Sequence, residues 1–227
     1  MRIALTGPSG SGKTTLAKHI EERYRLPFIS QSAGDIIPKY VKEQWEVLFN
    51  YKSKGHLNVI QLGHKHPEFA TDFQKELMRA RAGSVENQDP FVVDRCPVDI
   101  MVYTLLQASM YMTDMELHEM RMRLQLQLVN NYDIIIFVPT LSVAEVEDND
   151  SRIAVKPFQK SVVTPVFKNI MSLMLPEEAM SRDSRPYPLR HMEVDVWDWD
   201  ARVRQVTQFI DSYINETINA GQPEETA

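Results

Sequence analysis

The chain lacks the features of a secreted, membrane-spanning or zinc-stabilised protein. It has one cysteine, Cys96, which excludes an internal disulfide and favours a reducing compartment. No apolar run approaches the roughly 20 residues that cross a bilayer, and the first residues read as an apolar strand, so we expect no membrane segment and no cleavable signal. The six histidines are scattered, without the spacing of a zinc site. These absences predict a cytoplasmic protein.

The chain also lacks an excess of positive charge. It carries 25 Lys and Arg against 31 Asp and Glu, a net charge of −6, so binding to nucleic acid or an anionic membrane would need a local basic patch. Neither internal repeats nor low-complexity segments appear among the 227 residues. We therefore expect one domain over residues 1–220, followed by a flexible tail over residues 221–227.

The most informative stretch is residues 7–14, GPSGSGKT, which follows an apolar strand at residues 3–5 and precedes a helical pattern. This is the complete spacing of a phosphate-binding loop. Its glycines allow successive N–H groups to face phosphate oxygens, and the helix that begins near Lys13 adds its positive dipole end. Lys13 suits the β- and γ-phosphates, and the Thr14 hydroxyl suits Mg²⁺. The alternative is an ordinary Gly/Ser-rich connection. We predict that this stretch binds a nucleoside triphosphate through Gly7, Ser9, Gly10, Ser11, Gly12, Lys13, Thr14 and Thr15.

Strand and helix patterns alternate along the rest of the chain. Further strands are expected at residues 26–29, 91–93, 134–138 and 191–196, and helices at residues 14–24, 36–49, 67–81, 98–110, 113–130, 158–175 and 201–220. This order predicts an α/β fold in which a mostly parallel five-stranded sheet carries helices on both faces. Ligands of such sheets bind beyond the carboxyl ends of the strands. Asp94 directly follows one strand and is the natural Mg²⁺ partner of Thr14, the alternative being a helix N-cap.

Arg95 comes next, within the stretch Asp94-Arg95-Cys96-Pro97-Val98-Asp99. Here the chain resembles the nucleoside and nucleoside-monophosphate kinase families of P-loop proteins, especially the small P-loop kinases of bacteriophages and bacterial nicotinamide riboside kinases. The resemblance implies a three-layer P-loop NTPase fold with a lid, the use of ATP and Mg²⁺, and a contact of Arg95 with phosphate groups. The alternative for Arg95 is an ion pair with a neighbouring carboxylate such as Asp99.

The same resemblance implies an acceptor-binding helical region at about residues 31–82 and a lid at about residues 141–158. Asp35 would act as general base on the acceptor hydroxyl, or else cap the helix that follows it. Arg152 would close over the phosphates as a catalytic residue, or else lie in a solvated loop. Whether Arg152 acts alone or with arginines of the segment 182–190 stays open, as do the roles of that loop and of residues 50–66.

The leading interpretation is a kinase that transfers the γ-phosphate of ATP to a nucleoside or (deoxy)nucleotide. One alternative is a bacteriophage kinase that phosphorylates the hydroxymethyl group of 5-hydroxymethyluracil within DNA, for which Lys52, Lys54 or residues 182–190 would supply the basic strip. Another is a non-catalytic nucleotide-dependent switch, although the Asn-Lys-x-Asp sequence of guanine readers is absent. The Met-rich helices between residues 98 and 130 could form a homodimer interface, but we favour burial of Met115, Met120 and Leu124 within the monomer.

Overall fold

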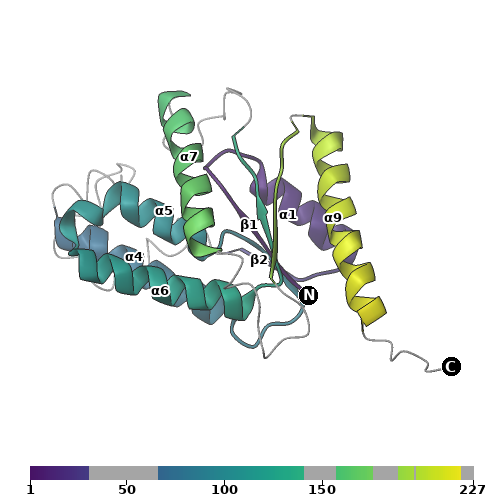
Figure 1. Cartoon of the computed structure of the whole chain (residues 1–227), viewed down its shortest axis with the longest axis horizontal. Coiled ribbons are helices and arrows are strands. Elements are labelled where there is room, and N and C mark those ends of the chain that lie inside the picture. Colours follow the sequence, from purple (N-terminus) through teal and green to yellow (C-terminus); the bar gives the residue numbers. More distant parts are fainter. Residues whose placement is uncertain (31–65, 141–156, 176–188, 197, 221–227) are drawn as a thin grey trace, which may run out of the picture.

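The computed structural model describes residues 1–30, 66–140, 157–175, 189–196 and 198–220 (Figure 1). The predicted Asp35, the predicted lid arginine Arg152, the segment 182–188 and the tail lie outside these ranges. The elements, in chain order, are β1 (Arg2–Thr6), α1 (Lys13–Tyr24), β2 (Phe28–Ile29), α4 (Pro67–Val85), β3 (Phe91–Asp94), α5 (Pro97–Gln107), the 3₁₀ turn η1 (Ser109–Tyr111), α6 (Asp114–Asn131), β4 (Ile134–Phe137), α7 (Pro157–Met174), β5 (Arg190–Glu193) and α9 (Trp199–Ala220).

The described strands form one five-stranded sheet in the order β2-β3-β1-β4-β5, and all four neighbouring pairs are parallel. Leu5 of β1 stands opposite Asp94 of β3 and Ile136 of β4, so these three strands end at the same edge. The phosphate loop leaves β1 at this edge. The predicted α/β fold with a parallel sheet is therefore confirmed.

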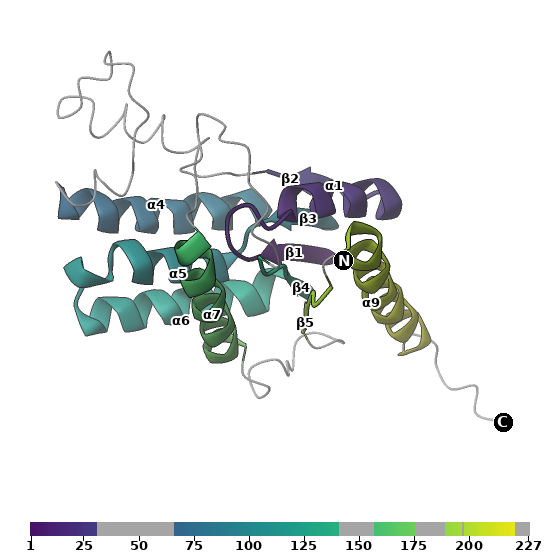
Figure 2. The same cartoon turned by 90° about the horizontal axis from the view of Figure 1, so that it is seen from above.

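Alternating side chains of the central strands cover the two faces of the sheet. On β4, Ile134 and Ile136 pack with the buried side chains of α1 and α9, whereas Ile135 and Phe137 pack with those of α4, α5, α6 and α7. Figure 2 shows α1 and α9 separated from α5, α6 and α7 by the strands. A strand covered on both faces needs the continuous apolar run Ile134-Ile135-Ile136-Phe137, as its sequence predicted.

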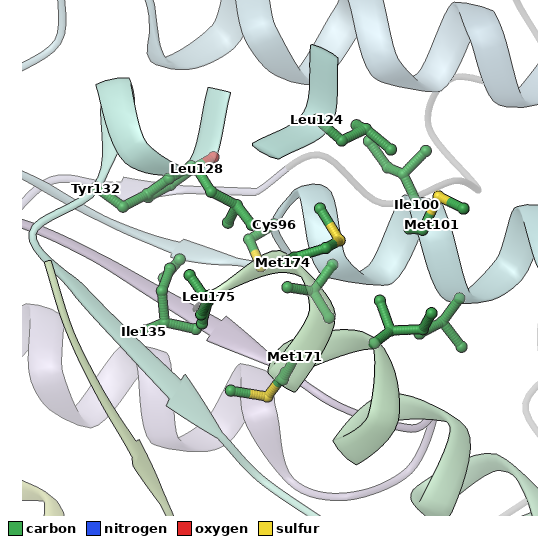
Figure 3. Packing of buried hydrophobic residues seen from close by; sticks show 14 of the residues in the cluster. Cys96, Ile100, Met101, Leu124, Leu128, Tyr132, Ile135, Met171, Met174 and Leu175 are labelled. Carbon is green, nitrogen blue, oxygen red and sulfur yellow. The ribbon is translucent and has the colours of Figure 1, made fainter. Parts of the chain in front are cut away.

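Methionines fill much of the larger core cluster. Figure 3 shows Met171 and Met174 of α7 in the same cluster as Ile135 of β4, with Met174 drawn beside Cys96. The unbranched methionine side chain adapts to irregular gaps between helices that meet at different angles. Met120 and Leu124 of α6 are fully or almost fully buried, as predicted. The burial predicted for Met115 is wrong, because its side chain is 72% exposed in the first turn of α6.

Several element boundaries differ from those expected. Strand β2 contains two residues and β5 ends at Glu193, so both edge strands are shorter than their apolar patterns indicated. Helix α4 continues through Gly83 to Val85, beyond the expected end at residue 81. Helix α6 begins with a capping box: the Thr113 hydroxyl accepts from the Glu116 N–H, and the Thr113 N–H donates to the Glu116 carboxylate. In the described part of the chain, no helix combines the length and apolar character that a membrane span requires.

Gly7, the first residue of the phosphate loop, passes directly against the end of β4. Its φ is +141°, and a Cβ atom there would lie 2.2 Å from the carbonyl oxygen of Val138. A side chain at Gly7 would push the phosphate loop away from the backbone of Val138, because the neighbouring atom is a backbone oxygen and not part of a flexible side chain. Glycine at this position is therefore a requirement of the close approach between β1 and β4.

We expect Gly7→Ala to lower the free energy of unfolding by at least about 2 kcal/mol, since it adds both a backbone clash and a strained φ. Urea denaturation of the purified protein measures this change. Gly83→Ala is the matched control: Gly83 lies in α4, and its Cβ would meet no atom within 4 Å. That variant should gain roughly 0.5–1 kcal/mol from the higher helix propensity of alanine. Equal effects of the two substitutions would contradict the steric interpretation of Gly7.

Candidate active site

The phosphate loop has the backbone geometry of an anion cradle. Gly7, Gly10 and Gly12 have φ values of +141°, +76° and +89°, which favour glycine. Helix α1 begins at Lys13, and Gly12 at its N-cap provides no side-chain cap. The first N–H groups of this helix therefore receive no capping side chain, and together with the positive end of the helix dipole they form a site for a phosphate group.

The ammonium group of Lys13 lies inside the loop. Its Nζ donates to the carbonyl oxygens of Gly7 (2.8 Å) and Pro8 (2.6 Å) and to the Ser11 hydroxyl (3.3 Å), and the residue is 4% exposed. A buried cation surrounded by loop carbonyls is placed to meet a phosphate oxygen that enters the same cradle. The structure thus places Lys13 inside the loop, and its role at the phosphates stays a prediction.

Thr14 and Asp94 meet beside the loop, as predicted for a metal site. The Thr14 hydroxyl donates to Oδ2 of Asp94, although the two residues are 80 positions apart in the sequence. The other carboxylate oxygen, Oδ1 of Asp94, is buried without a hydrogen-bond partner among the described residues. Buried polar atoms normally have a partner, and hydroxyl and carboxylate oxygens are the ligands that Mg²⁺ prefers. The pair therefore fits a magnesium ion or its bound water.

The alternative interpretation of Asp94 as a helix cap is not supported. The N-cap of α5 is Cys96, which forms a capping box with Asp99. The Cys96 thiol is fully buried, and this burial raises its pKa to about 12. A thiol in that state is a packing and capping group rather than a nucleophile, as its sequence context indicated.

Arg95 adopts a backbone conformation that is rare for a residue with a side chain, with φ at +96°. Its Nη1 donates to Oδ1 of Asp99 at 3.1 Å, and its guanidinium carbon lies 5.7 Å from the centre of the Tyr103 ring. Burial acts to lower the pKa of Arg95, but the carboxylate of Asp99 raises it above the ordinary value. The ion pair considered as an alternative role for Arg95 is thus present. It holds the guanidinium of Arg95, the residue that directly follows Asp94, in place.

Asp99 is the residue whose importance the sequence did not reveal. Its carboxylate is fully buried and accepts from the Thr6 hydroxyl at 2.8 Å, from the Cys96 N–H at 3.0 Å and from Arg95. Thr6 is the last residue of β1, directly before the phosphate loop. One carboxylate therefore connects the strand that carries the loop to the arginine that follows β3. The only signal in the sequence was a carboxylate four residues after Arg95.

A second guanidinium lies behind this ion pair. Arg81 of α4 is 7% exposed, and its Nε is buried without a hydrogen-bond partner among the described residues. Burial lowers the pKa of Arg81, while the nearby Asp99 carboxylate raises it. The site therefore contains more buried positive charge than the sequence motifs indicated.

The remaining predicted site residues differ in their placement. Thr15 lies on the exposed side of the first turn of α1. Arg190 was left open as a partner of the lid, but it begins β5 opposite Ile134, at the edge of the sheet away from the phosphate loop. It pairs there with Glu216 at 2.5 Å, so its position excludes a direct role at the phosphates. Among the described residues, no group of three or more His, Cys, Asp or Glu side chains forms another metal site.

Comparison with known families gives a match over most of the chain. Residues 2–160 match the family model described as AAA domain, and this span begins at β1 and includes the phosphate loop, Asp94 and Arg95. The chain belongs to the AAA domain family. The predicted similarity to P-loop nucleoside and nucleotide kinases is confirmed as well. Two parts of the sequence that carry this similarity, the phosphate loop and Asp94, meet in the structure through the bond between Thr14 and Asp94.

Curated relatives of this AAA domain protein include several adenylate kinases. That of Bartonella tribocorum is 28% identical over 136 residues, which cover 60% of this chain and 63% of the relative. That of Clostridioides difficile is 51% identical over 47 residues, which cover 21% of each chain. The chain thus spans less than two thirds of the length of these relatives.

Solved structures with the same fold include the NadR protein in complex with NR, with a TM-score of 0.56 at 13% sequence identity. The aligned region covers all of this chain and 53% of the NadR chain. Deoxyadenosine kinase from M. mycoides has a TM-score of 0.55 at 12% identity over 93% of this chain and 100% of its own. At these identities the similarity establishes the P-loop kinase fold alone.

We expect Asp99→Asn to destabilise the protein by about 3–5 kcal/mol, because it leaves the guanidinium of Arg95 without its buried countercharge. Urea denaturation provides the measurement. Asp72→Asn on the exposed surface of α4 is the matched control and should change stability by no more than roughly 0.5 kcal/mol. If both variants unfold at the same urea concentration, Asp99 does not have the structural role assigned to it.

Proposed function

We propose that this protein is an ATP- and Mg²⁺-dependent phosphotransferase whose acceptor is a nucleoside or nucleotide. The observation that carries the proposal is the meeting of Thr14 and Asp94 beside the phosphate loop, with one buried Asp94 oxygen left without a partner in the described structure. A phosphate cradle alone would serve any nucleotide-binding protein. The adjoining metal site and Arg95 add the groups that phosphoryl transfer requires.

In this mechanism the loop and Lys13 bind the β- and γ-phosphates of ATP, while Thr14 and Asp94 hold Mg²⁺. The metal, when bound, neutralises charge on the phosphates. Arg95 directly follows Asp94 at the carboxyl end of β3, and its guanidinium, which Asp99 holds in place, stabilises charge on the transferred group. The bond between the γ-phosphorus and the bridging oxygen breaks as the acceptor oxygen bonds to the phosphorus.

The acceptor side of the proposal depends on residues outside the described ranges. We propose that Asp35 takes the proton of the acceptor hydroxyl and that Arg152 closes over the transferring phosphate from a lid at about residues 141–158. The adenylate kinases among the relatives and the deoxyadenosine kinase fold support an acceptor of the nucleoside or nucleotide class. ATP is proposed as the donor on the same grounds.

The decisive test is transfer of γ-³²P from ATP to two acceptor pools. One pool contains nucleosides and nucleoside monophosphates, and the other contains DNA with 5-hydroxymethyluracil. We expect label in the small-molecule pool and a loss of at least about 10³-fold in the Lys13→Ala variant, because the loop then lacks its cation. Lys18→Ala, on the exposed side of the same helix, is the matched control and should retain full activity.

The other outcomes separate the alternatives. Label on DNA alone would replace the proposed acceptor with a base in a polymer, and this activity should then fall with rising salt. ATP binding without transfer to either pool would contradict a kinase and favour the nucleotide-dependent switch.

A second prediction concerns the metal. Asp94→Asn should raise the Mg²⁺ concentration needed for half-maximal activity by about ten-fold or more, because an amide oxygen is a weaker ligand than a carboxylate. A Mg²⁺ titration of transfer activity measures this, with Asp72→Asn as the control of equal charge change. An unchanged Mg²⁺ requirement in Asp94→Asn would show that Asp94 does not hold the metal.

A further inference from the structure

The phosphate loop is held from the C-terminal helix by one side chain, that of Arg202 on α9. Its Nη1 donates to the carbonyl oxygen of Ser11 at 3.1 Å, and its Nε donates to the carbonyl oxygen of Val196 at 2.9 Å. Ser11 lies in the loop after β1, and Val196 lies in the segment between β5 and α9. A single guanidinium therefore joins two loops that follow strands separated by β4 in the sheet.

The segment at the far end of this bridge is itself fastened to α9. The Asp195 N–H donates to Oε1 of Gln205 at 3.3 Å, and Nε2 of Gln205 donates to Oδ1 of Asp195 at 2.7 Å. The start of the helix is fixed by the Ala201 N–H, which donates to Asp198 at 2.9 Å. The start of α9, which carries Arg202, is therefore already fixed. The hydrogen bond from Arg202 to Ser11 consequently restricts the conformation of the phosphate loop rather than that of the helix.

The rest of the loop has few such attachments. Within the described structure, the other side chain that bonds to carbonyls of residues 7–12 is Lys13, which belongs to the helix directly after the loop. Ser11 lies between Gly10 and Gly12, and glycine loses more conformational freedom on ordering than any other residue. A segment bounded by two glycines gains conformational freedom when its external hydrogen bond is removed.

We propose that Arg202 is a positioning residue that holds the phosphate loop in its binding conformation before the nucleotide arrives. The guanidinium suits this task because its rigid planar fork donates from two separate nitrogens, Nε and Nη1, to two carbonyls in fixed directions. Arg202 does not need to contact the phosphates. Its effect on the reaction rests on the proposed function, but its effect on the loop does not.

Loss of Arg202 should therefore weaken ATP binding while leaving the turnover number almost unchanged. Without Arg202, only a fraction of the molecules have a binding-competent loop, and the dissociation constant for ATP rises by the inverse of that fraction. Once ATP is bound, its phosphates order the loop, so the turnover number at saturating ATP changes little. A loss of the protein fold would instead lower the fraction of the protein that binds ATP, the turnover number and the melting temperature.

The test compares three full-length variants by calorimetric titration with Mg²⁺-ATP. Arg202→Ala should raise the dissociation constant about ten-fold, and Arg202→Lys about three-fold because one carbonyl contact is kept. Arg204→Ala is the matched control, since Arg204 lies on the exposed side of the same helix, and it should bind ATP as the unmodified protein does. Melting temperatures of the three variants show whether the fold is retained.

Amide hydrogen exchange of residues 9–12 provides the second readout. In the absence of nucleotide, exchange should be faster in Arg202→Ala than in Arg204→Ala, while exchange in β1 and β4 stays the same. Unchanged loop exchange in Arg202→Ala overturns the proposal. If the unmodified protein binds no ATP, the proposed function fails instead, and the exchange comparison still decides the role of Arg202.

Discussion

The buried carboxylate of Asp99 constrains the end of the sheet that carries the phosphate loop. A charge removed from water costs several kcal/mol unless it is paired and hydrogen-bonded, and Asp99 is fully buried. Its partners are the Thr6 hydroxyl, the Cys96 N–H and the Arg95 guanidinium. Because Thr6 ends β1 while Arg95 and Cys96 form the turn between β3 and α5, satisfying the charge requires these two segments to meet. The phosphate loop begins directly at this junction.

The loop is therefore fixed from both faces of the sheet. Asp99 on α5 holds Thr6, the residue before the loop, and Arg202 on α9 holds Ser11 within it. Gly7 lies between these attachments and is pressed against the carbonyl of Val138. The helices on the two faces thus do more than cover the apolar strands, because each provides one polar side chain that defines the path of the loop.

Sequence patterns predicted the parts of this arrangement that depend on neighbouring residues. The spacing of residues 7–14 specifies the loop, and an apolar strand ending in a carboxylate places Asp94 beside it. The bonds of Thr6 to Asp99 and of Arg202 to Ser11 join residues 93 and 191 positions apart, and no local pattern encodes such contacts. The exposure of Met115 has a different cause: it lies five residues before Met120, and at about 100° per residue this spacing places it on the side of α6 away from the buried Met120, Leu124 and Leu128.

The charge of the site explains how an acidic chain can hold a polyanion. The net charge of −6 is spread over the whole surface, and salt screens exposed charges beyond about 8–10 Å. Lys13 and Arg81 are buried, and Arg95 is partly buried with its side chain 21% exposed, so their field at the loop is screened less. The negative charge of Asp99 neutralises one of these three cations. A metal ion bound at Asp94 would neutralise the negative charge of that carboxylate. Local positive charge thus concentrates at the single edge where the helix dipole of α1 also points, and this is where a triphosphate gains the most from binding.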